Sequence, residues 1–201
     1  MNTASVTQPS QEEKPGEYIV LLDEDLHEIG TAPKLASHHM HTPLHKAFSC
    51  YIFDDQGRFL VTRRALSKKV WPGIWTNSLC GHPGPGESDH DAIARRAHEE
   101  LGMTVRDITI LLPHYRYTTP PFDGVIENEI CPVYAARLNS ASTVNPDEVE
   151  DIYWTPWHDY THDLITHPDK FSYWATDQYK QLKTSTTLQS FTEMVSGTSR
   201  D

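Results

Sequence analysis

Residues 81–103 read GHPGPGESDHDAIARRAHEELGM, and this stretch decides the fold. Ser88 is a typical N-cap for a helix over residues 89–101, and Gly102 is a typical stop signal. Apolar residues recur inside the segment at four-residue intervals, which gives the helix one buried stripe. The stripe consists of Ile93, Ala97 and Leu101. The segment therefore predicts an amphipathic helix that packs on a neighbouring layer.

The end of this helix carries two adjacent carboxylates. Glu99 and Glu100 stand just before Gly102, and such a pair is a common way to hold a divalent cation against a phosphate. The residue that would supply a third carboxylate is Arg96. A positive charge beside a bound cation needs an explanation, which the rest of the chain provides.

Strand patterns lie on both sides of the helix. Two of them are hairpins, over residues 17–32 and over residues 47–65 around the turn DDQG. Further strands are predicted within residues 74–79, 108–119 and 124–138, and a second amphipathic helix within 171–182. Strands with one helix between them and another at the end predict a mixed α/β sandwich. Residues 1–16 and 184–201 are polar and are predicted to be tails, so residues 17–183 form the single domain.

Composition excludes several classes of partner. The net charge of −11 argues against nucleic acid or an anionic membrane as the main partner. No apolar run approaches the roughly 18 residues that a membrane-spanning helix needs, and the first 16 residues lack a secretory signal. Three widely spaced cysteines indicate reduced thiols and a cytoplasmic location.

Two carboxylates in the segment VIENEICPV are candidates for chemistry. Glu127 and Glu129 alternate along a predicted strand, so they share a face about 7 Å apart. Their apolar neighbours indicate burial, and two buried carboxylates repel each other unless a cation or a shared proton relieves them. The alternative is an edge strand whose acidic face is in water.

Histidines gather in the segment ASHHMHTPLHKAF. It holds His38, His39, His41 and His45 within eight positions, and His82 follows further along the chain. Imidazoles combined with carboxylates form divalent-metal sites suited to zinc, manganese or iron. A solvated histidine-rich loop is the alternative.

Two other segments also carry reactive or charged groups. TRRALSKK concentrates basic residues in an acidic chain, which suits a polyphosphate unless the run is merely a solvated loop. Cys80 lies in a glycine-rich loop two residues before His82, and a thiol there could take part in chemistry. Cys50 and Cys131 sit in apolar runs and are predicted to pack as small hydrophobes.

The spacing of the opening stretch resembles a Nudix box. Its positions are Gly81, five residues, Glu87, seven residues, Arg95, and then Glu99, Glu100, Gly102 and Met103. In that pattern Arg95 is followed by a glutamate, and hydrolases of the superfamily use the full set to hold magnesium around a diphosphate that they cut. Here Arg96 takes that place, which implies that a diphosphate is bound but not cut.

The wider chain resembles type 1 isopentenyl diphosphate isomerases. TRRALSKKVWPGIWTNSLCGHP, RYTT, GVIENEICPVYAAR and FSYW carry the resemblance, which runs from about Glu17 to Leu182. It implies a Nudix-type mixed-sheet α/β/α sandwich in a single domain. It also implies interconversion of isopentenyl and dimethylallyl diphosphate by a 1,3-proton shift, with a small allylic or homoallylic diphosphate as the partner. We further predict a monomer.

The same resemblance implies roles for particular residues. A Mn²⁺ or Zn²⁺ site is expected at His38, His45, His82, Glu127 and Glu129. Mg²⁺ is expected at Glu100 and the carbonyl oxygen of Cys80. The diphosphate is expected at Lys34, Arg64, Lys68 and Arg96. Proton transfer is expected at Cys80 and at Glu129 beside Tyr117, with Trp174 facing the developing cation.

Three alternative functions stay open at this point. A Nudix diphosphohydrolase would share the fold, although Arg96 and Cys80 speak against it. A cysteine-dependent hydrolase would use Cys80 as a nucleophile, and a non-catalytic binding module would use the histidine site only as a structural staple.

Overall fold

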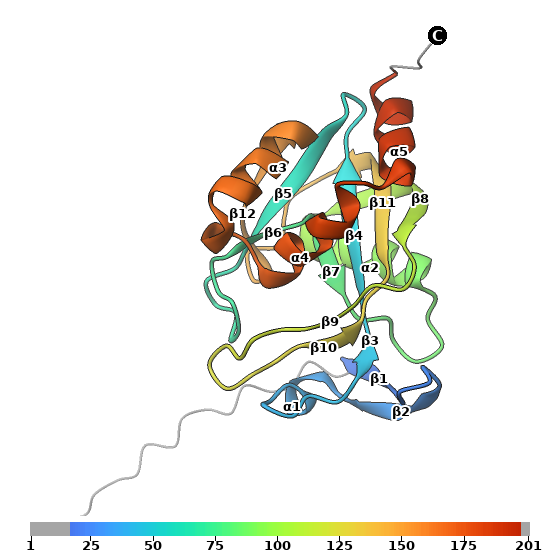
Figure 1. The fold of residues 1–201 in the computed structure, drawn as a ribbon, viewed down its shortest axis with the longest axis vertical. Coiled ribbons are helices and arrows are strands. Elements are labelled where there is room, and N and C mark those ends of the chain that lie inside the picture. Colours follow the sequence, from blue (N-terminus) through green and yellow to red (C-terminus); the bar gives the residue numbers. More distant parts are fainter. Residues whose placement is uncertain (1–16, 198–201) are drawn as a thin grey trace, which may run out of the picture.

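The computed structural model describes residues 17–197, and these residues form two mixed β-sheets and five α-helices (Figure 1). The predicted N-terminal tail, residues 1–16, lies outside the described residues. Within residues 17–197, none of the helices combines the length and the apolar character needed to cross a membrane.

The larger sheet has the strand order β12-β5-β4-β11-β8, with two short strands, β6 and β7, pairing with β5 and β4. Its strands are β4 (Phe48–Phe53), β5 (Arg58–Arg64), β6 (Trp75–Thr76), β7 (Leu79–Gly81), β8 (Met103–Leu112), β11 (Val133–Ala141) and β12 (Val149–Pro156). The central strand β4 is buried at all six positions and runs parallel to β11. Its side chains alternate between two hydrophobic clusters, one on each face of the sheet.

The smaller sheet positions residues that matter for the site. It has the order β2-β1-β3-β10-β9. Its strands are β1 (Tyr18–Leu22), β2 (Glu28–Pro33), β3 (His45–Lys46), β9 (Arg116–Thr118) and β10 (Asn128–Ile130). The parallel pairing of β10 with β3 places Glu129 opposite His45, and its antiparallel pairing with β9 places Glu129 opposite Tyr117.

Helix α2 (Asp89–Leu101) covers one face of the larger sheet, as the opening stretch of sequence predicts. The Ser88 side chain accepts a hydrogen bond from the backbone N–H of Asp91, and Gly102 ends the helix in the left-handed conformation. The predicted stripe of Ile93, Ala97 and Leu101 is fully buried. These capping and packing predictions are confirmed.

Three helices cover the opposite face of the sheet (Figure 1). They are α3 (Trp157–Thr166), α4 (Tyr173–Leu182) and α5 (Thr186–Ser196); a single turn, α1 (Lys34–Ser37), follows β2, and a 3-10 turn (Pro168–Lys170) follows α3. Hydrophobic clusters on both faces of one sheet, each covered by helix, make the predicted α/β/α sandwich.

Several sequence predictions differ from the structure. The prediction of a polar tail from residue 184 is wrong where α5 lies, because Leu188, Phe191 and Val195 of this helix are buried in the core. Their spacing of three and four residues fits a helix, but the intervening Ser and Thr residues conceal it. The strand predicted over residues 124–138 is two strands, β10 and β11, and that over 74–79 is replaced by β6 and β7. Strand β12 and helix α3 are absent from the sequence prediction.

Candidate active site

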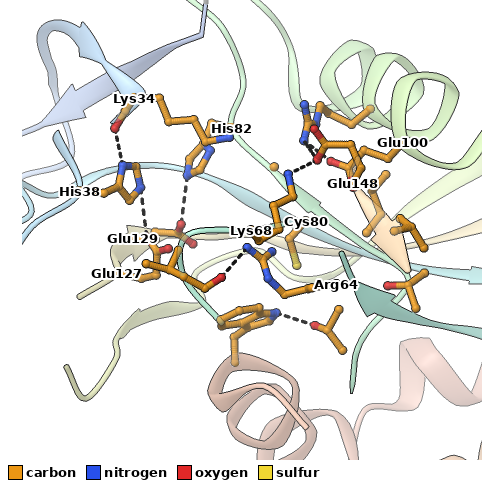
Figure 2. Close-up of a pocket in the computed structure, with 18 of the residues that line it drawn as sticks. Lys34, His38, Arg64, Lys68, Cys80, His82, Glu100, Glu127, Glu129 and Glu148 are labelled. Carbon is orange, nitrogen blue, oxygen red and sulfur yellow. Dashed lines mark hydrogen bonds and ion pairs between the residues drawn. The ribbon is translucent and has the colours of Figure 1, made fainter. Parts of the chain in front are cut away.

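A cavity of about 200 Å³ gathers side chains from both sheets and from helices α1, α2 and α4. Every site residue predicted from the sequence lines it except His45, which lies fully buried behind His82. The lining residues among those predicted are Lys34, His38, Arg64, Lys68, Cys80, His82, Arg96, Glu100, Tyr117, Glu127, Glu129 and Trp174. Figure 2 shows His38 and His82 with Glu127 and Glu129 at one end, Glu100 and Glu148 at the other, and Cys80 between them.

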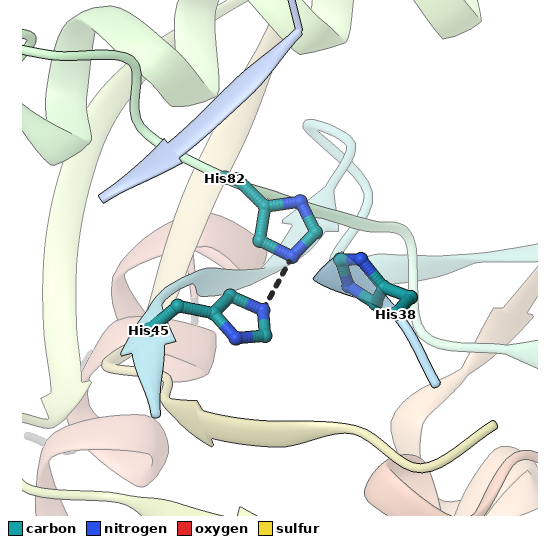
Figure 3. A group of neighbouring side chains, drawn as sticks. All are labelled: His38, His45 and His82. Atoms are coloured by element: carbon teal, nitrogen blue, oxygen red, sulfur yellow. Dashed lines mark hydrogen bonds between the residues drawn. The ribbon is translucent and has the colours of Figure 1, made fainter. Parts of the chain in front are cut away.

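Three imidazoles converge at the first end of the cavity (Figure 3). The Nε2 atoms of His45 and His82 face each other at 3.2 Å, and the rings of His38 and His45 have centroids 5.1 Å apart. His39 and His41 are not part of this group, and the backbone N–H of His41 donates to Nδ1 of His39. The structure therefore separates the clustered histidines that the residue pattern alone left open.

Backbone carbonyls fix the orientation of two of these rings. His38 Nδ1 lies 2.6 Å from the Lys34 carbonyl oxygen, and His45 Nδ1 lies 2.9 Å from that of Pro43. A carbonyl can only accept, so each Nδ1 carries a hydrogen, and in the neutral ring Nε2 then presents a lone pair. Donation of the second ring nitrogen to a carbonyl is the usual arrangement of a metal-ligating histidine.

Two carboxylates complete the cluster. Glu129 Oε1 lies 3.1 Å from His82 Nε2 and 3.6 Å from His45 Nε2, and Glu127 Oε2 lies 3.1 Å from His38 Nε2. Beyond this mutual contact, neither His38 Nε2 nor Glu127 Oε2 has a hydrogen-bond partner within residues 17–197, although both atoms are buried. Converging lone pairs and unpartnered buried acceptors are costly unless a cation neutralises them, so this donor set fits a divalent metal.

Two groups of this cluster, His82 and Glu129, are held in the protonation states that a metal requires. Burial lowers the pKa of His82 to about 3, which keeps its ring neutral. Burial alone would raise the pKa of Glu129, but the neighbouring imidazoles of His45 and His82 outweigh it and hold that pKa well below its usual range. Neutral imidazole and ionised carboxylate are the forms that coordinate metal ions.

The predicted diphosphate-binding cations are arranged around the rest of the cavity. Lys34 Nζ lies 3.0 Å from Glu17, Lys68 pairs with Glu148, and Arg96 pairs with Glu100. Each of these cations is thus matched by a carboxylate of the chain. Arg64 differs, because its guanidinium donates to the carbonyls of Val70 and Trp71 and lies over the Trp174 ring, 5.9 Å from the centroid.

Glu100 and Cys80 occupy the second end and the middle of the cavity. Burial raises the pKa of Glu100 despite the neighbouring Arg96, and a cation bound there would favour its ionised form. Burial also raises the pKa of the Cys80 thiol to about 12, which keeps the sulfur protonated in the absence of a ligand. Of the three cysteines, Cys50 and Cys131 are buried, as predicted, and Cys80 is partly exposed.

The aromatic residues form one wall. Tyr117 stacks on Tyr115, and the Trp174 indole donates to the hydroxyl of Thr76 at 2.8 Å. Trp71 meets the Trp174 ring edge-on, with centroids 5.6 Å apart. These contacts hold the Trp174 ring rigidly beside the cavity and make that wall largely apolar.

Comparisons with known proteins concern the chain as a whole. The NUDIX domain model matches residues 43–175. A protein of Mycolicibacterium vanbaalenii named isopentenyl-diphosphate Delta-isomerase is 54% identical over 141 residues, which is 70% of this chain and 78% of that protein. One of Salmonella typhi with the same name is 48% identical over 162 residues, 81% of this chain and 90% of that protein.

The chain belongs to the isopentenyl-diphosphate Delta-isomerase family of Nudix proteins. The resemblance seen in the sequence is therefore confirmed, and so is the Nudix-type fold. Solved structures show the fold independently. DR0079 from Deinococcus radiodurans superposes with a TM-score of 0.64 at 18% identity, covering 83% of this chain and 99% of its own. A MutT protein from Methanosarcina mazei gives 0.54, also at 18% identity, covering 70% and 94%.

In this member of the isomerase family, the Nudix box keeps its structural clamp. Arg95 donates two hydrogen bonds of 2.7 Å to Glu87, and Glu87 accepts another from the backbone N–H of Gly84. The departure from the hydrolase pattern lies one residue further on. Arg96 is buried on the cavity side of α2 and paired with Glu100, so the third carboxylate position of the box is occupied by a cation.

Five polar residues beside the cavity were not singled out from the sequence. Glu17 and Glu148 pair with Lys34 and Lys68, respectively. Ser49 and Asn77 contact the Cys80 sulfur, and Gln178 contacts Ser49. Ser49 sits within an apolar segment and Gln178 among other polar residues of a predicted helix, so nothing local marks either of them. Their exposed fraction of zero in the structure is the signal that reveals them.

Proposed function

We propose that this chain is an isopentenyl-diphosphate isomerase that interconverts isopentenyl and dimethylallyl diphosphate through a 1,3-proton shift. The observation that carries the proposal is the position of Cys80, which shares one small cavity with Glu129 and with a set of cations. The reaction needs two proton-handling groups and an anchor for the diphosphate, and the cavity offers both. The family of the chain supports this reading.

The diphosphate would bind to Lys34, Arg64, Lys68 and Arg96. Lysines and arginines form charge-assisted hydrogen bonds with phosphate oxygens. Because Glu17 and Glu148 already pair with Lys34 and Lys68, the substrate would replace these carboxylates as the partner of the cations. The isoprenoid tail would then extend toward the apolar wall formed by Trp174 and its neighbours.

The chemical step adds one proton and removes another. A proton goes to the terminal alkene carbon, which leaves a tertiary cation, and a proton leaves the methylene two carbons away, which forms the new double bond. We assign these transfers to Cys80 and to Glu129 beside Tyr117. Pairing in the smaller sheet puts Tyr117 directly opposite Glu129, so the phenol can hydrogen-bond at the site of transfer.

The wall of the cavity would protect the cation between these two transfers. The Trp174 ring can stabilise the positive charge through its π electrons. A closed aromatic wall also excludes water, which would otherwise capture the cation as an alcohol.

Two metal sites are part of the proposal. His38, His45, His82, Glu127 and Glu129 would hold a Mn²⁺ or Zn²⁺ ion, because mixed imidazole and carboxylate ligands suit these metals. Glu100 and the Cys80 carbonyl oxygen would hold Mg²⁺ with the diphosphate. Bound metal would supply a fixed positive charge that organises the carboxylates and helps to anchor the diphosphate.

We also propose that the protein acts as a monomer in the cytoplasm. All three cysteines are free, which suits a reducing compartment. Sedimentation at assay concentration would test the monomer directly.

One incubation tests the reaction itself. The protein is mixed with isopentenyl diphosphate, Mg²⁺ and Mn²⁺, and the products are separated. Dimethylallyl diphosphate without phosphate release supports the isomerase. Release of phosphate or isopentenyl monophosphate would instead identify a Nudix hydrolase, and recovery of unchanged substrate would refute both.

A substitution at Arg96 tests the diphosphate site. Arg96→Glu replaces an attractive charge with a repulsive one, and a charge-assisted hydrogen bond to phosphate contributes roughly 1.5–3 kcal/mol. We expect KM to rise at least about tenfold, since about 1.4 kcal/mol is one decade. We expect no gain of hydrolysis, although the third glutamate of the Nudix box is restored. Steady-state kinetics and a phosphate assay measure both.

A second variant separates binding from folding. Glu17, Glu100 and Glu148 surround Arg96, so an additional carboxylate there also destabilises the fold. Arg96→Gln removes the charge without adding repulsion and should raise KM by a similar factor. Arg106→Gln, at a partly exposed arginine that pairs with Asp55 away from the cavity, is the matched control. An unchanged KM in a folded Arg96→Gln protein would mean that Arg96 does not touch the diphosphate.

A further inference from the structure

The Cys80 sulfur rests on a group of buried polar side chains. Ser49 Oγ lies 3.2 Å from Cys80 Sγ, and the thiol donates to Asn77 Oδ1 at 3.1 Å. Behind Ser49, Gln178 Nε2 donates to Ser49 Oγ at 2.8 Å, and the Tyr51 hydroxyl donates to Gln178 Oε1 at 2.9 Å. The sulfur therefore has a chain of three side chains on one side and an amide on the other.

The burial of these three hydrogen-bonded side chains costs free energy and needs a reason. Ser49, Tyr51 and Gln178 each have an exposed fraction of zero. Burying amides and hydroxyls costs free energy unless every group is hydrogen-bonded, and apolar residues of the same shape would stabilise such a core at least as well. Gln178 projects from α4 across the core to reach the central strand β4. The arrangement therefore points to a role beyond stability.

The hydrogen bonds among these side chains all run in one direction, from Tyr51 through Gln178 and Ser49 to the sulfur. An amide oxygen can only accept, so Tyr51 must donate to Gln178, and the Gln178 amide must then donate to Ser49. Ser49 has accepted that bond, so its own hydrogen is free for a sulfur. Cys80 Sγ at 3.2 Å is nearer than Cys131 Sγ at 3.5 Å. The Ser49 hydroxyl is thus aimed at Cys80.

The opposite side of the sulfur is fixed just as firmly. Asn77 Nδ2 donates to the Leu79 carbonyl at 3.2 Å, which settles the orientation of the amide and turns Oδ1 toward the thiol. The Thr76 hydroxyl donates to the same Oδ1 at 2.9 Å, and Thr76 in turn accepts from Trp174. When the Cys80 sulfur carries a hydrogen, Asn77 therefore offers it an acceptor. When the sulfur carries none, Ser49 offers it a donor.

We propose that Ser49, aligned by Gln178 and Tyr51, is a positioning residue that holds the Cys80 sulfur in place for proton transfer. This inference rests on the proposed function. In the proton shift, a C–H bond of the substrate breaks as an S–H bond forms, or the reverse in the other direction of reaction. The sulfur must keep one place against the substrate in both forms. The donor from Ser49 and the acceptor from Asn77 provide a partner for each form.

The test compares Ser49→Ala, Gln178→Met and the double variant. Loss of a hydrogen bond to a charged sulfur predicts a fall in kcat of roughly ten- to a hundredfold. KM should change by less than about twofold, because none of these residues is among those assigned to the diphosphate. If Gln178 acts through Ser49, the double variant should lose no more than Ser49→Ala alone. If the two substitutions were independent packing defects, their fold losses in kcat would instead multiply in the double variant.

A matched control distinguishes this role from general packing. Tyr134→Phe deletes a hydroxyl that bonds Asp89 at 2.6 Å on the opposite face of the same sheet. It should leave kcat unchanged. The inference is overturned if folded Ser49→Ala keeps wild-type kcat, if KM rises in place of a fall in kcat, or if the two losses multiply. Should Ser49→Ala melt below the assay temperature, Gln178→Met decides by the same split between kcat and KM.

A spectroscopic measurement keeps the inference separate from the proposed function. The S–H stretching band of Cys80 in the infrared, assigned by its loss in Cys80→Ser, reports the hydrogen bonds at the sulfur without any turnover. We expect this band to shift in Ser49→Ala and in Gln178→Met, and to stay in place in Tyr134→Phe. A shifted band in a protein that does not isomerise the substrate would overturn the proposed function alone. An unshifted band would overturn the contact between Ser49 and Cys80.

Discussion

Cys80→Ser is expected to lower kcat by on the order of a thousandfold, within the range that general acid–base catalysis contributes, while the substrate still binds. The hydroxyl of serine is far less acidic than a thiol, so it cannot exchange a proton with the substrate carbon at a useful rate. The diphosphate would be held by Lys34, Arg64, Lys68 and Arg96, none of which contacts the sulfur through a hydrogen bond or ion pair among the described residues. Stopped-time assays for kcat and calorimetry for binding measure the two effects separately.

The other two cysteines provide the controls. Cys50 is fully buried in the cluster beneath α2, so Cys50→Ser should reduce the melting temperature and leave kcat close to wild type. Cys131 packs in the opposite cluster beside Ser49, and Cys131→Ser should behave in the same way. Wild-type turnover in Cys80→Ser would remove this thiol from the proton shift. Loss of binding together with kcat would assign it a structural role.

The sequence predicted those parts of the fold whose signals are local. Helix α2 carries its own cap at Ser88, its own stop at Gly102 and a regular apolar stripe, so it needed no tertiary information. Helix α5 has the same kind of stripe, but its threonines and serines suit a loop equally well, and only packing against the sheet decides between the two states. Strand β12 was not predicted from the sequence for a related reason, because most of its residues are polar or only half buried at a sheet edge.

For the candidate site, the residue pattern alone could not choose among the histidines. His38 and His39 are adjacent and chemically identical, and the choice between them came from resemblance to a family. The structure separates them by their bonds, because the His38 ring donates to the Lys34 carbonyl and faces the cavity, whereas the His39 ring accepts from the backbone of His41. Buried partners such as Gln178 were beyond reach, since contact with Ser49 joins residues that are 129 positions apart.

Removal of the metal from the histidine site is expected to abolish turnover and to lower the melting temperature. A ligand that binds only the folded state stabilises it by about 4 kcal/mol at a thousand times its dissociation constant. For a chain of this size each kcal/mol shifts the melting temperature by about 2–4 °C, which gives a fall of roughly 8–16 °C. Dialysis against a chelator followed by calorimetric melting measures the shift, and an assay at low temperature measures activity of the protein that stays folded.

Rescue and substitution identify the site responsible. Adding Mg²⁺ alone to the stripped protein should not restore activity, whereas Mg²⁺ with Zn²⁺ or Mn²⁺ should, because imidazole ligands prefer the latter metals. His45→Ala removes a proposed ligand whose side chain is fully buried, and it should melt at the temperature of stripped wild type with no further fall on chelation. His41→Ala, in the same segment but exposed and outside the cluster, should retain the metal and should still show the fall in melting temperature on chelation. If chelation changes the melting temperature of both variants equally, the converging imidazoles hold no metal.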